Sequence, residues 1–241
     1  MKTESIRLIA MDLDGTLTQH KEPLEEANRI CLDALRQRYS LLMVGAGQVM
    51  RIFNQLGGYP IDVVGNYGLQ YGEYDPAEKT VVIKRDLTFP VERESVKERI
   101  EMLRQRHGFT EYRGESVEYH PSGCVTFPIL GTKAIQADKL AFDPDRKKRR
   151  KILSEVTEVF SDYTVFVGGS SSFDMAPRPF DKAYALELYC KEKGLKKENV
   201  VYIGDDYGEG GNDESVLKAG YQFIKIDNYR DLPTLVKCLL E

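Results

Sequence analysis

Blocks of apolar residues along the chain favour short buried strands and amphipathic helices in turn. The first apolar run predicts a strand over Ile6–Met11, and the helical spacing of the apolar positions after it predicts a helix over Pro23–Arg38. The same alternation continues with strands at Leu41–Val44 and Ile61–Val64, around a helix that ends before Gly57. This order of elements predicts a parallel sheet with helices on its faces.

A different pattern occupies the middle of the chain, where strands follow one another without helices between them. Two short strands are predicted around the turn His120–Gly123, and two more between Thr164 and Met175. Amphipathic helices are predicted over Val91–His107 and from about Asp145 to Phe160. These elements favour a small antiparallel sheet backed by two helices.

The first pattern returns after Pro179 and continues to the end of the sequence. Its predicted elements are helices at Asp181–Lys193, Asp213–Ala219 and Leu232–Leu239 and strands at Val200–Ile203 and Phe223–Ile226. We therefore expect an α/β fold whose parallel core is formed by residues 1–84 and 179–241. An α+β cap domain over residues 85–178 would be inserted into it.

Composition excludes several classes of function. The 34 Lys and Arg residues against 38 Asp and Glu give a net charge of −4, which argues against a dedicated nucleic-acid binder. No apolar run reaches the roughly 18 residues of a membrane span. The four cysteines form no CxxC pair and the three histidines no HExxH motif, so zinc and redox sites are not expected. Reduced cysteines are typical of a cytoplasmic protein, and the chemistry must come from carboxylates, lysines and backbone.

Two carboxylates leave the first predicted strand together. Asp12 and Asp14 are followed by Gly15, and ligands of open α/β sheets bind beyond the carboxyl ends of the strands. One carboxylate can be a nucleophile, and the other can protonate a leaving oxygen and then deprotonate a water. An Asp-Gly turn after a strand is also a common structural feature, so this pair alone leaves the chemistry open.

A second acidic loop follows the strand Val200–Ile203 and contains Asp205. The carboxyl ends of parallel strands meet at one edge, so Asp205 is expected to converge with Asp12 and Asp14, and three such oxygen-donor sites suit Mg²⁺. Lys182, at the start of a predicted helix, could bridge the nucleophile and a phosphate oxygen. A surface loop and a solvated lysine are the alternative interpretations of these two features.

Taken in order, DLDGTLT at 12–18, Lys182 and GDD…GGND at 204–213 resemble the haloacid dehalogenase (HAD) superfamily of phosphotransferases. The resemblance implies a Rossmann-like core, an aspartyl-phosphate on Asp12, and Asp14 as general acid/base. It implies Mg²⁺ held by Asp12, by Asp14 through its backbone carbonyl, and by Asp205. The residues implied to support metal and phosphate from the same loop are Asn212 and Asp213.

The place of the insertion resembles the C2-capped (type IIB) branch, and the whole chain is similar to eukaryotic-type phosphomannomutases. The similar stretches are VGAGQ, NYGLQY, VEYHPSG and VGGSSSFDMAP. The fragment GNYG is also similar to a motif of trehalose-phosphate phosphatases. These resemblances imply a small phosphorylated sugar or polyol as substrate. They also imply a possible homodimer through the cap, whereas charge and composition predict no nucleic-acid or membrane partner.

The sequence departs from the family pattern at several positions. The superfamily usually holds the phosphate with Ser or Thr after the second strand, where this chain has Gly47 by the mutase pattern or Ala46 by the commoner pattern. The mutase pattern needs arginines for a second phosphate, and the matching positions here carry Lys21, His120, Thr132 and Lys139. Lysine lacks the planar two-donor fork of arginine. The positions that match the substrate contacts of the pattern are Ser172 and Asp174.

These observations favour a Mg²⁺-dependent phosphatase of a small phosphorylated sugar or polyol. The missing arginines favour hydrolysis, because an unheld bisphosphate would leave before it reorients. A phosphomannomutase-like phosphohexomutase is the first alternative, and a catalytically weak sugar-phosphate-binding protein is the second. The basic run Arg146–Lys151 is predicted to form a solvated outer helix face, with binding to an acidic surface or nucleic acid as the less favoured interpretation.

Overall fold

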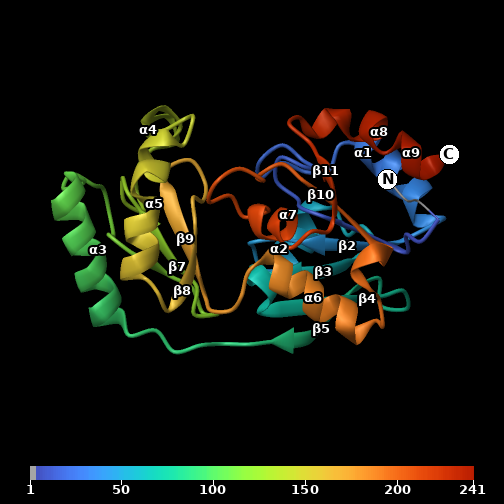
Figure 1. Ribbon diagram of the computed structural model, residues 1–241, viewed down its shortest axis with the longest axis horizontal. Coiled ribbons are helices and arrows are strands. Elements are labelled where there is room, and N and C mark those ends of the chain that lie inside the picture. Colours follow the sequence, from blue (N-terminus) through green and yellow to red (C-terminus); the bar gives the residue numbers. More distant parts are fainter. Residues whose placement is uncertain (1–3) are drawn as a thin grey trace. The chain divides into compact units, whose positions relative to one another are not determined.

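The computed structural model describes residues 4–241, which form two compact units (Figure 1). The first unit, which we call the core, contains the described residues up to Asp86 together with Asp181–Gly208 and Asp213–Glu241. The second unit, the cap, contains Leu87–Phe180 and the short segment Glu209–Asn212. The cap is thus largely one insertion in the chain of the core.

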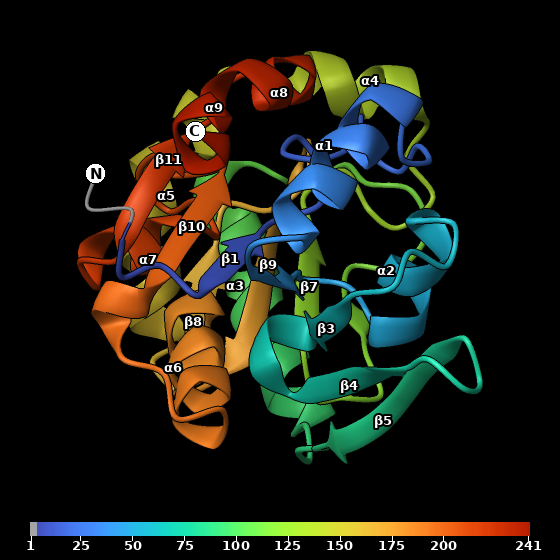
Figure 2. The same ribbon diagram turned by 90° about the vertical axis from the view of Figure 1, so that its right-hand side faces the viewer.

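The core is built on a seven-stranded sheet of order β11-β10-β1-β2-β3-β4-β5 (Figure 2). Its five parallel strands are β1 (Leu8–Met11), β2 (Ser40–Val44), β3 (Asp62–Gly65), β10 (Val200–Gly204) and β11 (Gln222–Lys225). Two antiparallel strands, β4 (Gln70–Asp75) and β5 (Thr80–Asp86), extend one edge. The predicted α/β class with a parallel-dominated core sheet is confirmed.

Helices cover both faces of this sheet because the buried strands are apolar on both sides. Ile9 and Met11 pack in one hydrophobic cluster with residues of α1, α2, α8 and α9, whereas Leu8 and Ala10 pack with α6 and α7. No helix in residues 4–241 is long and apolar enough to cross a membrane. The helices of the core are α1 (Glu26–Arg36), α2 (Val49–Gln55), α6 (Lys182–Glu192), α7 (Glu214–Lys218), α8 (Leu232–Leu235) and α9 (Lys237–Leu240), with short 3₁₀ turns η1 (Asn66–Gly68), η2 (Lys197–Asn199) and η3 (Tyr229–Asp231).

Two details of the core differ from the sequence-based expectation. The helix predicted over Leu232–Leu239 is divided into α8 and α9, because Val236 has a non-helical ψ of 3°. Strand β4 was not predicted, because its sequence QYGEYD mixes glycine and acidic residues with the tyrosines. It forms through its ladders with β3 and β5, which are tertiary contacts that no local pattern encodes.

The cap is a four-stranded antiparallel sheet of order β6-β7-β9-β8. Its apolar face packs with α3 and α5, and the rings of Phe127 and Phe173 stack on neighbouring strands with centroids 6.0 Å apart. Helix α4 was not predicted, since it is only seven residues long and none of its residues is buried. The elements are α3 (Arg93–His107), β6 (Glu118–Tyr119), β7 (Val125–Pro128), α4 (Gln136–Phe142), α5 (Lys147–Val159), β8 (Tyr163–Phe166) and β9 (Ser172–Pro177).

The prediction that the basic run forms a solvated face is wrong at Arg149. The side chain of Lys147 is exposed, but Arg149 is 1% exposed and its Nε lies 2.9 Å from an oxygen of the buried Asp143. Its NH1 donates to the carbonyl oxygens of Gly168 at 2.5 Å and Ser172 at 3.0 Å. Arg149 can be buried because Asp143 neutralises its charge and the loop carbonyls accept its remaining protons.

Replacing Arg149 by methionine should destabilise the protein strongly. The substitution keeps an unbranched apolar side chain but leaves Asp143 buried without its cation, which costs about 3–5 kcal/mol. Urea denaturation followed by circular dichroism measures the change in the free energy of unfolding. The exposed Lys147→Ala is the control and should shift it by less than about 0.5 kcal/mol. An Arg149→Met protein as stable as wild type would show that the ion pair with Asp143 does not stabilise the protein.

Candidate active site

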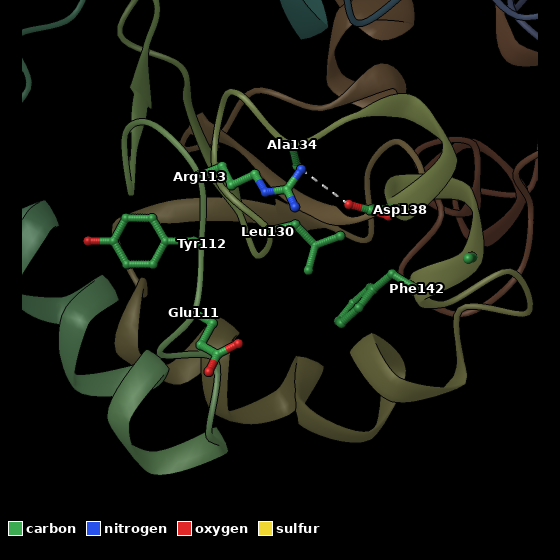
Figure 3. A pocket seen from close by; sticks show the side chains of 8 residues that line it. Glu111, Tyr112, Arg113, Leu130, Ala134, Asp138 and Phe142 are labelled. Atoms are coloured by element: carbon green, nitrogen blue, oxygen red, sulfur yellow. Dashed lines mark ion pairs between the residues drawn. The ribbon is translucent and has the colours of Figure 1, made fainter.

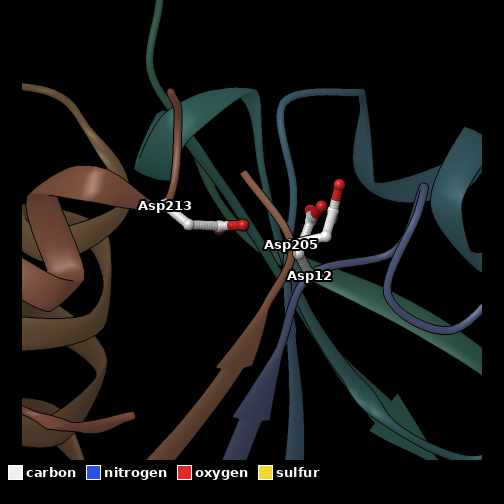
Figure 4. Close-up of side chains that lie close together, drawn as sticks. All are labelled: Asp12, Asp205 and Asp213. Carbon is white, nitrogen blue, oxygen red and sulfur yellow. The ribbon is translucent and has the colours of Figure 1, made fainter. Parts of the chain in front are cut away.

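Three carboxylates converge at the carboxyl edge of the core sheet (Figure 4). Asp12 follows β1, Asp205 follows the adjacent parallel strand β10, and Asp213 immediately precedes α7. Each offers one oxygen atom within 4.8 Å of the others. The sequence predicted that Asp205 would meet Asp12 and Asp14, which is confirmed for Asp12 and wrong for the side chain of Asp14. It placed Asp213 only in a supporting role. The structure brings Asp213 into the same cluster.

Lys182 lies in direct contact with this cluster. Its Nζ atom is 2.7 Å from Asp12 Oδ1 and 2.7 Å from Asp213 Oδ1, and its side chain is fully buried. Lys182 is the first residue of α6, and the preceding Asp181 caps that helix by accepting a hydrogen bond from the backbone N–H of Tyr184 at 2.7 Å. The helix start therefore fixes where the lysine enters the site.

The loop after β1 closes tightly around Asp205. The hydroxyl of Thr16 donates to Asp205 Oδ1 at 2.9 Å. Gly15 has a φ of 98°, and a Cβ atom there would lie 2.4 Å from Asp205 Oδ2. A glycine is required at this position both by the positive φ and by the close approach of the carboxylate.

Three carboxylates and one lysine lie close together in the cluster and shift one another's pKa values. Burial raises the pKa of Asp12 well above its ordinary value, Lys182 opposes this, and Asp213 and Asp205 add to it. Burial and the repulsion from Asp213 raise the pKa of Asp205 to about 6. Burial lowers the pKa of Lys182, but Asp12 and Asp213 raise it more, so the net shift is upward. When all four groups are ionised, two negative charges remain in excess, and this all-oxygen donor set fits a hard divalent cation such as Mg²⁺.

The side chain of Asp14 lies outside the three-carboxylate cluster. Its Oδ1 atom accepts hydrogen bonds from the backbone N–H of Lys21 at 2.8 Å and from Gln55 Nε2 at 2.7 Å. The side chain of Asp14 is therefore not one of the clustered carboxylates, and the metal role that the family resemblance implies for this residue is one of its backbone carbonyl. Gln55 was not among the site residues predicted from the sequence. Its position on the last turn of α2 gives no chemical signal until the fold shows which loop that turn faces.

The other residues predicted from the loops are not all part of the carboxylate cluster. Gly47 connects β2 to α2, and its carbonyl oxygen accepts from the backbone N–H of Asn66 at 2.8 Å. Lys21 is exposed, and its contact with Asp14 is made by its backbone. Asn212 belongs to the cap unit, whereas Asp213 belongs to the core.

A polar cluster forms within the cap around Asp174 on β9. Its Oδ1 atom accepts from the hydroxyl of Thr126 at 3.0 Å and from that of Ser172 at 3.4 Å, and His120 Nε2 lies 3.1 Å from the same threonine oxygen. Burial raises the pKa of Asp174, and these neighbours partly oppose the shift. Lys139, on α4, has no hydrogen bond or ion pair to this cluster within the described part of the chain. The structure thus groups three of the predicted cap residues and adds Thr126.

A separate hollow of about 440 Å³ lies in the cap between the segment after α3 and helix α4 (Figure 3). Arg113 and Asp138 face each other across it with NH1 and Oδ2 3.6 Å apart, and Leu130 and Phe142 line its apolar side. None of the predicted site residues lines this hollow. It is therefore not part of the polar cluster around Asp174.

The chain is similar in sequence to one protein family and in fold to solved structures. Residues 29–223 match the model of the family described as eukaryotic phosphomannomutase. The phosphomannomutase of Encephalitozoon cuniculi is 25% identical, over 90% of this chain and 86% of that protein, and that of Solanum lycopersicum is 27% identical, over 91% and 88%. A solved phosphatase of the HAD superfamily from Bacteroides thetaiotaomicron has a TM-score of 0.63 at 15% identity, covering 99% of this chain and 97% of that one. The family match rests on the sequence, and the solved structure shows that the fold is shared.

Proposed function

Because the chain belongs to the eukaryotic phosphomannomutase family, within the HAD superfamily, we propose that it is a Mg²⁺-dependent phosphatase of a small phosphorylated sugar or polyol. The observation that carries this proposal is the contact of one buried lysine with Asp12 and Asp213 beside Asp205. This arrangement suits transfer of a phosphoryl group to a carboxylate.

In the first half of the reaction Asp12 acts as the nucleophile. One of its carboxylate oxygens attacks phosphorus, the bond between phosphorus and the sugar oxygen breaks, and an aspartyl-phosphate forms. Lys182 keeps Asp12 ionised and oriented through the 2.7 Å contact, against the burial that raises the pKa of this carboxyl. The proton that the leaving sugar oxygen needs comes from Asp14, in its protonated form.

In the second half a water molecule attacks the phosphorus of the aspartyl-phosphate. Asp14, now ionised, takes a proton from this water, the bond between Asp12 and phosphorus breaks, and inorganic phosphate leaves. Gln55 and the backbone N–H of Lys21 fix the rotamer of Asp14 through their hydrogen bonds. The same side chain thus serves as acid and then as base from one fixed position.

Asp12, Asp205 and the backbone carbonyl of Asp14 would hold the Mg²⁺ ion, with Asp213 bracing the site through Lys182 and the backbone N–H of Asp206. When bound, the ion supplies positive charge against the negative charge of the phosphoryl group. The excess of two negative charges in the cluster supports the proposal that the protein requires Mg²⁺.

The cap residues support hydrolysis over isomerisation. A mutase must hold the second phosphate of a bisphosphate while the intermediate turns round. The hydroxyl of Thr132 accepts from the backbone N–H of Glu115 at 2.9 Å, and His120 contacts Thr126. Neither supplies the two-donor fork of an arginine, nor does Lys139. Asp174 and Ser172 offer hydrogen-bond acceptors and a hydroxyl that suit a neutral polyol.

Phosphohexomutase activity is the second candidate, and the family match favours it. The relatives named as phosphomannomutases cover most of this chain. Both candidates share Asp12, Asp14 and Lys182, and they differ in whether water or a second sugar hydroxyl receives the phosphoryl group.

Product analysis separates the two candidates. The purified protein is given hexose 1-phosphate, Mg²⁺ and a hexose bisphosphate primer, and both free phosphate and hexose 6-phosphate are measured. We expect phosphate release to exceed isomerisation, to stop in excess chelator, and to return when Mg²⁺ is added. Hexose 6-phosphate formed faster than phosphate would overturn the phosphatase proposal in favour of the mutase. Full activity in chelator would remove the metal requirement.

A further inference from the structure

Tyr202, on β10, reaches the carboxylate cluster with its hydroxyl group. Side chains alternate along a strand, and Tyr202 faces the side of the core sheet that α6 and α7 cover, in the same hydrophobic cluster as Leu8 and Ala10. Its side chain is fully buried. An apolar residue could fill this position without the cost of burying a hydroxyl group. The hydroxyl of Tyr202 therefore needs a hydrogen-bond partner inside the protein.

The partner of this hydroxyl is the carboxylate of Asp213. The hydroxyl donates to Asp213 Oδ1 at 2.6 Å, a distance typical of a hydroxyl bonded to an ionised carboxylate. Gly204, two residues further along β10, makes this contact possible. A Cβ atom there would lie 2.5 Å from Asp213 Oδ2 and 2.8 Å from Cε1 of the Tyr202 ring. The missing side chain of Gly204 therefore leaves the space in which the ring and the carboxylate meet.

The Asp213 carboxylate is held by donors from a strand, a helix and a loop. Its Oδ1 atom accepts from the Tyr202 hydroxyl and lies 2.7 Å from Lys182 Nζ. Its Oδ2 atom accepts from the backbone N–H of Asp206 at 3.0 Å. An ionised carboxylate only accepts hydrogen bonds, so the phenol and the ammonium group can both donate to Oδ1. The carboxylate cannot rotate without the loss of at least one of these bonds.

The orientation of Asp213 in turn fixes the ammonium group of Lys182. Asp213 extends from the start of α7 toward Asp12 (Figure 4), and Lys182 Nζ lies 2.7 Å from the Oδ1 atom of each. The four-carbon side chain of a lysine is flexible, so its position depends on the groups that bind its ammonium. If Asp213 turned away, the ammonium group would move toward Asp12 and cover the oxygen that has to attack phosphorus.

We propose that Tyr202 is a positioning residue of the phosphoryl-transfer site, which holds Asp213 and, through it, the ammonium group of Lys182 beside Asp12. The proposal rests on the function proposed above, in which Asp12 is the nucleophile. Tyr202 does not touch the substrate in this role. It affects the rate because the attack on phosphorus requires a narrow range of distance and angle, which depends on where Lys182 holds the Asp12 carboxylate.

Tyr202→Phe tests the proposal, because it removes the hydroxyl and keeps the ring. Hydrolysis of p-nitrophenyl phosphate at saturating Mg²⁺ gives kcat and KM, and we expect kcat to fall about ten- to hundred-fold while KM changes by less than about twofold. The matched control is Tyr189→Phe, since Tyr189 is buried in the same hydrophobic cluster and its hydroxyl donates to Asp62 Oδ2 at 3.0 Å. It should leave kcat unchanged. Wild-type kcat in Tyr202→Phe, or an equal loss in both variants, would overturn the proposal.

A double-mutant cycle with Asp213→Asn shows whether Tyr202 acts through Asp213. Tyr202→Phe should lower kcat much less in an Asp213→Asn protein than in wild type, because the carboxylate that the hydroxyl holds is already gone. Urea denaturation of the same proteins in chelator gives a coupling that needs no turnover, and the two losses of stability should again not add. Independent effects of the two substitutions, in the rate or in the stability, would overturn the proposal.

Failure of the proposed function gives a different result. If the protein transfers no phosphoryl group, wild type itself hydrolyses neither p-nitrophenyl phosphate nor any sugar phosphate, and both the function and the role of Tyr202 are rejected. If wild type is active and Tyr202→Phe is equally active, the function stands and only the positioning role of Tyr202 is wrong.

Discussion

Asp12→Asn should abolish turnover and leave the fold intact. The amide of asparagine is a poor nucleophile and cannot bind a divalent cation as an anion. Phosphate monoesters hydrolyse extremely slowly without a catalyst, so we expect the rate to fall by at least about 10⁴-fold and to become undetectable. Phosphate release under saturating Mg²⁺ measures the loss.

The same substitution should not unfold the protein. Burial and two neighbouring carboxylates raise the pKa of Asp12, so its charged form is costly in the folded state near neutral pH. Lys182 retains Asp213 as a partner at 2.7 Å when the charge at position 12 is removed. The melting temperature without Mg²⁺ should therefore stay unchanged or rise. Wild-type turnover by a folded Asp12→Asn protein would rule out Asp12 as the nucleophile.

Lys182→Met should lose both activity and stability. Asp12 and Asp213 would then lie buried side by side without a cation, and removal of one partner from a buried ion pair costs about 3–5 kcal/mol. Chemical denaturation in chelator measures the stability, and phosphate release measures the activity. Mg²⁺ should restore part of the stability, because a bound cation adds RT ln(1 + [Mg²⁺]/Kd) to the free energy of unfolding.

Two further variants make this expectation specific to the cluster. Lys191→Met changes an exposed lysine of the same helix and should alter the free energy of unfolding by less than about 0.5 kcal/mol. Adding Asp213→Asn to Lys182→Met removes one unpaired charge and should recover stability but no activity. A Lys182→Met protein as stable as wild type in chelator would show that the lysine does not compensate these carboxylates.

Much of the fold could be predicted because hydrophobic period and strand length are local properties. The runs at β1, β2 and β10 are almost wholly apolar, as is typical of strands buried on both faces, and their alternation with helices indicates a parallel sheet covered on each side. Strand β4 and helix α4 carry no such signal. The first exists through its partners β3 and β5, and the second has no buried residue.

Some residues of the site could be predicted from the sequence and others could not. The convergence of Asp12, Asp205 and Lys182 follows from topology, since strand ends and a helix start meet at one sheet edge. The places of Gln55 and Arg149 depend on which side of a helix faces which loop. Hydrophobic periodicity assigns polar positions to solvent, so it cannot predict a buried arginine such as Arg149, paired with Asp143.

Strand β1 is synthesised long before its partner β10, and this delay affects how the protein folds during translation. Leu8 pairs with Val200, so one edge of the interior strand β1 has no partner until the ribosome has added almost two hundred residues. At about 5–20 residues per second this interval lasts about 10–40 s. During it the nascent chain exposes an apolar strand edge that can pair with another chain. The yield of native protein should therefore respond to translation speed and to chaperones more than its final stability suggests.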